Sequence, residues 1–350
     1  MGQAGKSLDP FAKECFSGIK GYLAISILVH HLYLFTAFFS NTSIGDALYL
    51  LGHYGVVCFF FLSGFGLFSS YKTKGEVYVK SLLLGRIIPF YLSYLFVVAI
   101  YTAYNLLMHN PISANLMIRS LTYGGTIVNF GWYFQTALLM YILFYVLKLL
   151  VKDDVTFIAI LGTIILAFIF LYYFFISSEK TEYEPTFSFF VGIVFAHVYH
   201  RKGSLFAHKP ALFTAIGLAA FLSLAAFSTM YNFRYNDYQW VACKSDFIYL
   251  LLMMVTDLAL IFFMTACIAF VGKTAPCLIC NSFSRFLGKH SLEIYGLQGL
   301  FLCLLDDKIG NRVIYATVAV MCIIASSLPV HQFLYWVKRW VSKCAPKQSC

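Results

Sequence analysis

A lysine and two histidines stand inside an otherwise apolar run near the start of the chain, FSGIKGYLAISILVHHLYLF (residues 16–35). Histidine is costly in the apolar centre of a bilayer, and residues found there usually serve a function. Lys20 and His31 are eleven residues apart. At about 100° per residue, a helix brings them back to within about 20° of the same face, whereas His30 points about 80° away from Lys20. The spacing therefore selects His31 as a titratable group on the same face as a cation.

The chemistry that this face offers is proton transfer. Eleven residues of helix rise about 16 Å, roughly half of a bilayer core of about 30 Å. Lys20 is then expected at the cytoplasmic membrane surface and His31 near the middle. An imidazole can take up or release a proton near neutral pH. The alternative is a histidine that only packs against a neighbouring helix and is hydrogen-bonded to it.

The composition places the whole chain in a membrane. The 350 residues are 61% hydrophobic and 11% charged, against about 25% charged residues in soluble domains. The net charge of +10 is typical of loops that set membrane orientation, and we expect no nucleic-acid partner. We predict an all-α polytopic bundle that forms a single domain over residues 1–350, with membrane lipids around it and short cytoplasmic tails at 1–16 and 338–350.

Ten apolar segments are each long enough, or nearly so, to cross a bilayer as a helix. The sixth is short and the ninth is the most polar. They cover residues 17–40, 49–70, 84–108, 131–150, 155–177, 186–200, 210–230, 247–270, 286–305 and 312–337.

Basic residues alternate between the loops that join these segments. One set of loops and tails holds Lys6, Lys13, Lys72, Lys74, Lys80, Lys148, Lys152, Arg201, Lys202, Lys209, Lys273, Arg285, Lys338, Arg339, Lys343 and Lys347. The other set holds only Arg119, Lys180, Arg234, Lys244, Lys308 and Arg312. Because cytoplasmic loops carry the excess of basic residues, both termini are predicted to be cytoplasmic.

The cysteines do not indicate a disulfide framework or a metal centre. Ten cysteines are scattered along the chain, most of them in apolar segments or cytoplasmic loops. Cys277 and Cys280 form a C-x-x-C pair, but no second pair or histidine pattern accompanies it. We therefore predict no metal site and no bound cofactor.

Five stretches resemble, in order, the membrane acyltransferase-3 family. That family has Arg or Lys, ten residues and then His in its first span, which matches Lys20 and His31. Two departures stand out: Leu83 occupies the place of the first of two arginines in the family's third span, and Gln298 occupies the place of a late histidine. The stretches are GIKGYLAISILVHHLYLF, YGVVCFFFLSGFGLF (54–68), GRIIPFYLSYL (85–95), GWYFQTALLMY (131–141) and FLGKHSLEIYGLQ (286–298).

The resemblance implies an O-acyltransferase, usually an O-acetyltransferase, that uses cytoplasmic acyl-CoA as donor. The acceptor is then a hydroxyl of a sugar, such as an envelope polysaccharide or a lipid-linked glycan, and the location is a bacterial cytoplasmic membrane. His31 is expected to be the base or the acyl carrier. The CoA phosphates need basic residues on the cytoplasmic side, and Lys20, Lys80 and Arg86 are placed to bind them.

Four further residues are candidates for the substrate path, each with a structural alternative. Ser63 and Gly64 can line the path or simply allow close contact between helices. Tyr54 and Trp132 can stack on a sugar ring or on adenine, or act as ordinary interface aromatics.

Two acids fall inside the predicted spans, where acids are functional candidates by default. Asp257 matches no stretch of the resemblance; it either pairs with a basic neighbour or is neutral. Glu293 lies four residues after Lys289, so an ion pair within one helix can account for it.

Two other classes remain open. A transporter also has many spans and intramembrane titratable residues, but the sequence lacks the two-half symmetry of many transporters. A glycan-export assembly protein without catalysis would not need a base in line with a cation. Consumption of acyl-CoA separates the enzyme from both alternatives.

The charge pattern predicts a definite topology. Reporter fusions after residues 45, 115, 182, 240 and 309 should be external, and fusions after residues 76, 152, 204 and 278 should be internal. One reversed pair would change the number of spans, and a global reversal would contradict a cytoplasmic donor site.

Overall fold

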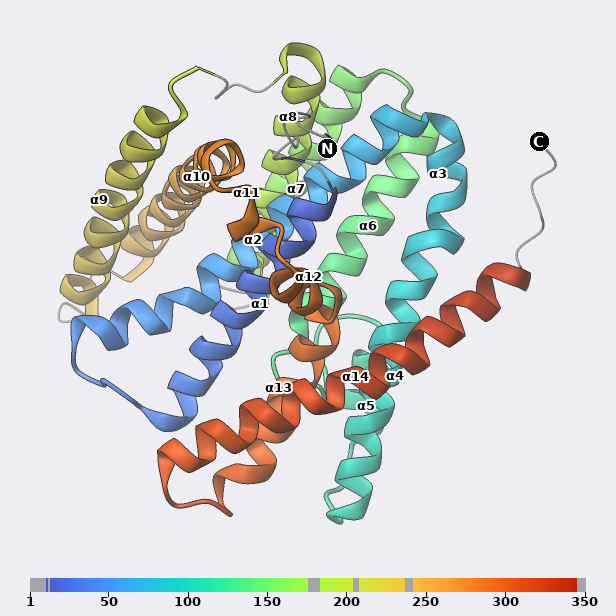
Figure 1. Ribbon diagram of the computed structural model, residues 1–350, viewed down its shortest axis with the longest axis vertical. Helices are drawn as coiled ribbons and strands as arrows, with labels where there is room; N and C mark the ends of the chain where they lie inside the picture. Colours follow the sequence, from blue (N-terminus) through green and yellow to red (C-terminus); the bar gives the residue numbers. More distant parts are fainter. Residues whose placement is uncertain (1–10, 12, 176–182, 204–207, 237–241, 345–350) are drawn as a thin grey trace, which may run out of the picture. The chain divides into compact units, whose positions relative to one another are not determined.

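The chain folds as helices joined by turns in a computed structural model that describes residues 11, 13–175, 183–203, 208–236 and 242–344 (Figure 1). These ranges contain no strand, which confirms the predicted all-α fold. The helices of the first half are α1 (Lys13–Thr36), α2 (Ser43–Lys74), α3 (Glu76–Leu82), the π-helix η1 (Leu83–Ile87), α4 (Ile88–Leu107), α5 (Ala114–Leu121), α6 (Trp132–Leu150) and α7 (Asp154–Phe175). Those of the second half are α8 (Thr186–Lys202), α9 (Pro210–Asn236), α10 (Ala242–Thr274), α11 (Pro276–Ile279), α12 (Ser282–Lys289), α13 (Ser291–Asp306) and α14 (Arg312–Cys344).

Eight helical stretches of the described residues are long and apolar enough to cross a membrane. This confirms a polytopic helical protein. The other two predicted spans, 186–200 and 286–305, correspond to α8 and α13, which have only 17 and 16 residues. The predicted span 286–305 is interrupted at His290, whose backbone is not helical. The number of ten spans and the cytoplasmic termini stay predictions.

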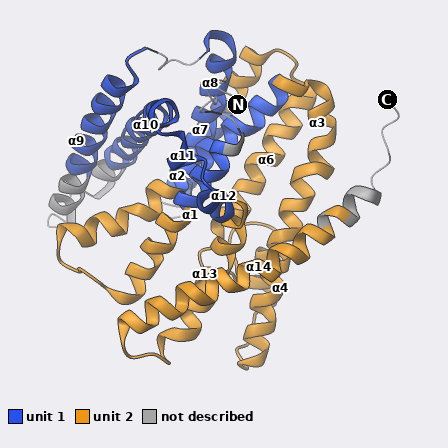
Figure 2. Cartoon of the chain, in the orientation of Figure 1, with its two compact units in different colours: residues 1–23, 56–72, 162–288 blue, residues 24–55, 73–161, 289–350 orange. Residues whose placement is uncertain are grey.

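The chain divides into two compact units, which Figure 2 colours separately and which we describe one at a time. Unit 1 contains residues 1–23, 56–72 and 162–288, and unit 2 contains residues 24–55, 73–161 and 289–350. The division falls within α1 and within α2. Each unit is therefore built from segments far apart in the sequence.

Unit 1 depends on a close crossing of α2 and α8. A Cβ atom built on Gly64 of α2 would lie 2.0 Å from the carbonyl oxygen of Phe189, and one on Gly192 of α8 would lie 2.2 Å from that of Phe61. The two backbones are thus in contact, which only glycine allows. The fully buried rings of Phe61 and Phe189 lie in the same crossing.

In unit 2, a proline shapes the segment that carries Arg86. Pro89 has no N–H to bond to the Gly85 carbonyl, and its ring would clash with that carbonyl in a regular α-helix. The chain forms a π-turn at Leu83–Ile87 just before it, and α4 then starts with Pro89 in its first turn. Such turns are frequent at functional sites. The position of Arg86 is therefore determined by a local departure from α-helical geometry.

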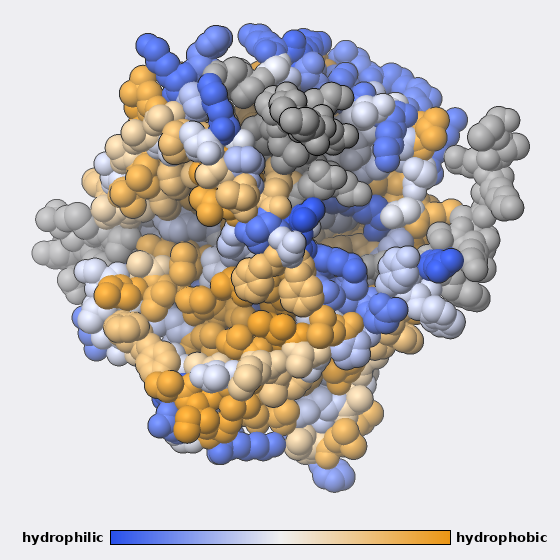
Figure 3. Space-filling model, viewed as in Figure 1, coloured by the Kyte–Doolittle hydropathy of each residue, from blue (hydrophilic) through white to orange (hydrophobic). Residues whose placement is uncertain are grey.

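Apolar side chains remain on the surface, as a membrane protein requires. Leu107, Leu150 and Phe175 are 78%, 74% and 79% exposed. Much of the face visible in Figure 3 is hydrophobic. Lipid is the solvent in which such exposure is stable.

The α2–α8 crossing generates a paired stability prediction. Gly64→Ala should lower the thermal stability of the purified protein, because overpacking typically costs about 1–3 kcal/mol. Gly66→Ala on the same helix is the control, since a Cβ there meets no atom within 4 Å. It should leave stability unchanged or raise it slightly. Equal melting temperatures for the two variants would contradict the close crossing.

Candidate functional site

His31 is buried in unit 2 between an aromatic ring and an amide. Its side chain is 6% exposed, and its imidazole stacks on Phe130 with ring centroids 3.8 Å apart and an interplanar angle of 18°. The side-chain amide of Gln298, on α13, lies beside it, and neither polar atom of that amide makes a hydrogen bond among the described residues. The stacking thus fixes the plane of the imidazole and leaves its ring nitrogens able to interact with polar groups.

The position of Phe130 is held from two sides. Its φ of 63° lies in the left-handed region, which is unusual for a bulky residue and marks functional segments. The hydroxyl of Tyr295, on α13, donates to the Phe130 carbonyl. Gln135, on α6, donates to the Gly125 and Arg119 carbonyls at 2.9 and 2.7 Å, which anchors the loop that precedes Phe130.

Gln298 reaches His31 because α13 packs closely on this loop. A Cβ atom on Gly299 would lie 2.6 Å from that of Asn129. Gln298 itself is fully buried. Its amide can orient the imidazole by donating or accepting a hydrogen bond, but it cannot relay a proton at neutral pH.

His30 has different surroundings, as the helix angle predicts. Its ring lies 5.6 Å from the ring of Tyr49, and it packs over Gly52, both on α2. It is half-buried. The two adjacent histidines therefore meet different elements of unit 2.

Arg86 lies in unit 2 among phenol rings. Its guanidinium carbon is 5.1 Å from the centroid of the Tyr141 ring, and Tyr78 is a second neighbour. Within the described part of the chain Arg86 forms no ion pair. Because no carboxylate neutralises it, its charge can bind an anionic ligand.

Lys80 is exposed on α3, close to Glu76. Glu76 forms an ion pair with Lys152. Lys80 therefore adds positive charge at the start of the same helical run as Arg86, with one acid nearby.

An aromatic wall joins the two parts of the site inside unit 2. It starts at Phe130, which stacks on His31, and ends at Tyr141, whose ring lies against the Arg86 guanidinium. Tyr295 lies 5.5 Å from Phe134, Phe134 lies 5.9 Å from Phe90, and Phe90 lies 5.3 Å from Tyr141. The wall consists of Phe130, Tyr295, Phe134, Phe90 and Tyr141.

The other predicted site residues are divided between the units. Lys20 is half-buried and belongs to unit 1, as do Ser63 and Gly64. The contact of Gly64 with the Phe189 backbone favours helix packing over a place in the substrate path. Tyr54 and Trp132 belong to unit 2, where Tyr54 contacts His53 and Trp132 contacts the adjacent Tyr133.

The structure places side chains from other segments of the chain beside the two intramembrane acids. Glu293 pairs with Nδ1 of His331, on α14, at 3.0 Å, rather than with Lys289. Asp257 is buried, and its hydrogen-bonding neighbour in unit 1 is another acid, Glu184. Sequence reasoning flagged both acids as intramembrane but missed these partners, which lie on other segments of the chain.

The family comparison covers this whole arrangement. A family model described as "Acyltransferase domain" matches residues 14–336, from the start of α1 almost to the end of α14. No curated protein sequence and no solved structure matches the chain. The matched range contains His31, Arg86 and Gln298. The chain therefore belongs to the acyltransferase-3 family of membrane acyltransferases.

Proposed function

We propose that this membrane acyltransferase moves an acyl group, in the first instance acetyl, from cytoplasmic acyl-CoA to a hydroxyl of a cell-surface glycan or lipid-linked sugar. His31 is the base or the acyl carrier. The observation that carries the proposal is the buried His31 imidazole, stacked on Phe130 with the neutral amide of Gln298 beside it. Family membership supports acyl transfer, and the setting of His31 supports its role in that reaction.

Two routes use the same imidazole. As a base, His31 takes the proton of the attacking hydroxyl while that oxygen bonds to the thioester carbonyl and the CoA thiolate leaves. As a carrier, an imidazole nitrogen attacks the carbonyl, the C–S bond breaks, and the acyl-imidazole then passes its acyl group to the hydroxyl. Burial of His31 protects either route from water, which would otherwise hydrolyse the acyl group.

The proposed donor site consists of basic side chains that bind the CoA phosphates at some distance from His31. CoA carries its phosphates at the far end of a long arm, so the phosphate-binding cations need not touch His31. Arg86, which forms no ion pair with the acids that the structure describes, is the main candidate, with Lys80 on the same helical run. Lys20 is the third, because it shares α1 and a helix face with His31.

The proposed location follows from the proposed donor and acceptor taken together. A cytoplasmic acyl-CoA and an envelope sugar favour the cytoplasmic membrane of a bacterium. The non-catalytic alternatives, a transporter or a glycan-export assembly protein, predict that acyl-CoA is not consumed. Release of free CoA by purified protein with a glycan acceptor distinguishes the enzyme from both.

The two histidines provide the sharpest test. His31→Ala should reduce acyl transfer by about 10²–10⁴-fold, the usual loss with a general base, without lowering the amount of protein in the membrane. His30→Ala is the matched control and should keep most of the activity. His31→Gln keeps hydrogen bonding but cannot take a proton, so it should be inactive as well. Full activity of His31→Gln would leave His31 only a packing role.

Arg86 is tested through the donor. Arg86→Ala should raise the apparent KM for acyl-CoA and weaken its dependence on salt, because one charge pair is lost. Arg86→Lys should recover part of the loss, since it restores the charge without the planar fork. The control Arg312→Ala removes an arginine that pairs with Asp306 and should leave the KM unchanged. An unaltered KM and salt dependence in Arg86→Ala would remove Arg86 from the donor site.

A further inference from the structure

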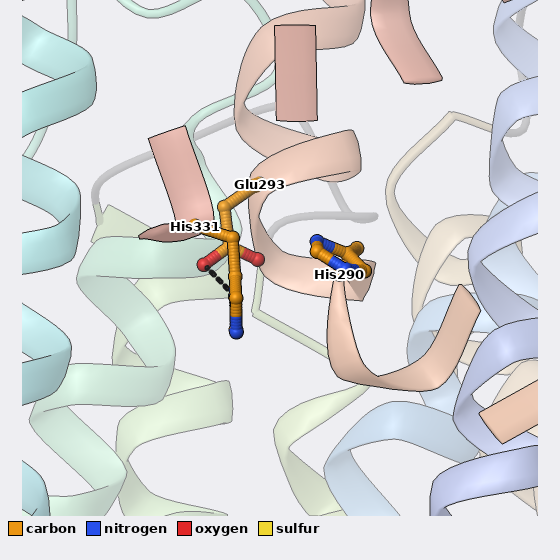
Figure 4. Close-up of side chains that lie close together, drawn as sticks. All are labelled: His290, Glu293 and His331. Carbon is orange, nitrogen blue, oxygen red and sulfur yellow. Dashed lines mark hydrogen bonds and ion pairs between the residues drawn. The ribbon is translucent and has the colours of Figure 1, made fainter. Parts of the chain in front are cut away.

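A second cluster of titratable side chains lies in unit 2 where α13 begins. His290 immediately precedes α13, Glu293 lies in its first turn, and His331 lies on α14 two residues after Pro329. One potential ligand atom from each of the three residues lies within 4.8 Å of the other two. In the view of Figure 4, one Glu293 carboxylate oxygen points to His331 and the other lies on the side of His290.

The carboxylate of Glu293 is the least compensated group of the cluster. Its side chain is 3% exposed, and only Oε1 has a partner, His331 Nδ1 at 3.0 Å. Oε2 is buried and makes no hydrogen bond among the described residues. A buried carboxylate with an unused oxygen is expensive unless a cation lies close to it. The polar groups around it are imidazoles, which are cation ligands as well as proton acceptors.

The arrangement fits a transition-metal ion better than a proton alone. Two imidazole nitrogens and one carboxylate oxygen form a common three-residue ligand set of zinc, with water as the fourth ligand. Bonds of about 2.0–2.1 Å in a tetrahedron place ligand atoms about 3.3 Å apart. Glu293 Oε1 and His331 Nδ1 are already closer than this, at 3.0 Å. The His290 and His331 rings contact each other, with centroids 4.4 Å apart.

We propose that His290, Glu293 and His331 bind a zinc ion that fastens the start of α13 to α14. This replaces the sequence-based expectation of a chain without a metal site. His290 immediately precedes α13 and Glu293 lies in its first turn, so the start of α13 brings both residues to one ion. The helix interruption at His290 is what brings its ring to the side of α14.

The role of the ion is structural. α13 also carries Gln298 and Tyr295, which contact His31 and hold Phe130. A cation between α13 and α14 would neutralise Glu293 and fix the register of the two helices. The inference concerns binding and stability, so it stands or falls independently of the acyl donor and acceptor.

Zinc content is the first measurement. The full-length protein is purified in detergent, washed with a weak chelator and analysed by elemental mass spectrometry. To exclude the C-x-x-C pair as a source of zinc, all proteins carry Cys277→Ser and Cys280→Ser. About one zinc per chain is expected in this background. Glu293→Gln and His331→Ala should bind zinc at least about 100-fold more weakly, since even outer partners of a metal contribute 10–100-fold.

Thermal stability is the second measurement, and it needs no variant of the cluster. Removal of zinc with a strong chelator should lower the melting temperature, and added Zn²⁺, but not Mg²⁺, should restore it. His208→Ala, at an exposed histidine outside the cluster, is the control and should keep both the zinc and the response. If a cluster variant does not fold, His290→Asn provides a more conservative loss of one ligand.

Two results would overturn the proposal. Zinc content that is equal in the background protein, Glu293→Gln and His331→Ala would place the metal elsewhere. A melting temperature that does not respond to chelation or to Zn²⁺ would reduce the cluster to a buried Glu293–His331 pair.

Discussion

The hydrogen bond from Tyr295 to the Phe130 carbonyl holds in place the ring on which His31 stacks. A left-handed backbone conformation is strained for phenylalanine, and this hydrogen bond helps to hold Phe130 in it. The ring of the same tyrosine belongs to the aromatic wall that leads to Arg86. Tyr295 thus contributes through its hydroxyl to the packing of α13 on the loop before α6 and to the plane of the candidate base, and through its ring to the wall that ends at the candidate donor-binding arginine.

Much of the architecture could be predicted from the sequence. Apolar segments of about 20 residues predict the helices, because in lipid a helix satisfies all of its backbone hydrogen bonds within one segment. Helix periodicity separates His30 from His31, and the structure gives them different neighbours. These inferences succeed because they depend on residues close together in the sequence and on one regular geometry.

The rest depends on contacts between distant segments, which periodicity does not encode. His331 is 38 residues from Glu293, and the two meet only because α13 and α14 pack side by side. Glu184 lies between the predicted apolar segments 155–177 and 186–200, yet it is buried beside Asp257. Phe130 was overlooked because nothing in its local sequence marks a loop residue as the stacking partner of a histidine on another helix.

The π-turn at Leu83–Ile87 changes how this chain should be compared with its family. A π-turn accommodates one more residue than an α-turn, so it acts as a one-residue insertion inside a helix. Residues before and after it follow two helical patterns that are offset by about 100°. An ungapped alignment with a relative that lacks the turn would misplace one side of it by one position. Leu83, which stands where the family has an arginine, lies inside this turn between Leu82 and Leu84, so a shift of one position in either direction still leaves a leucine there.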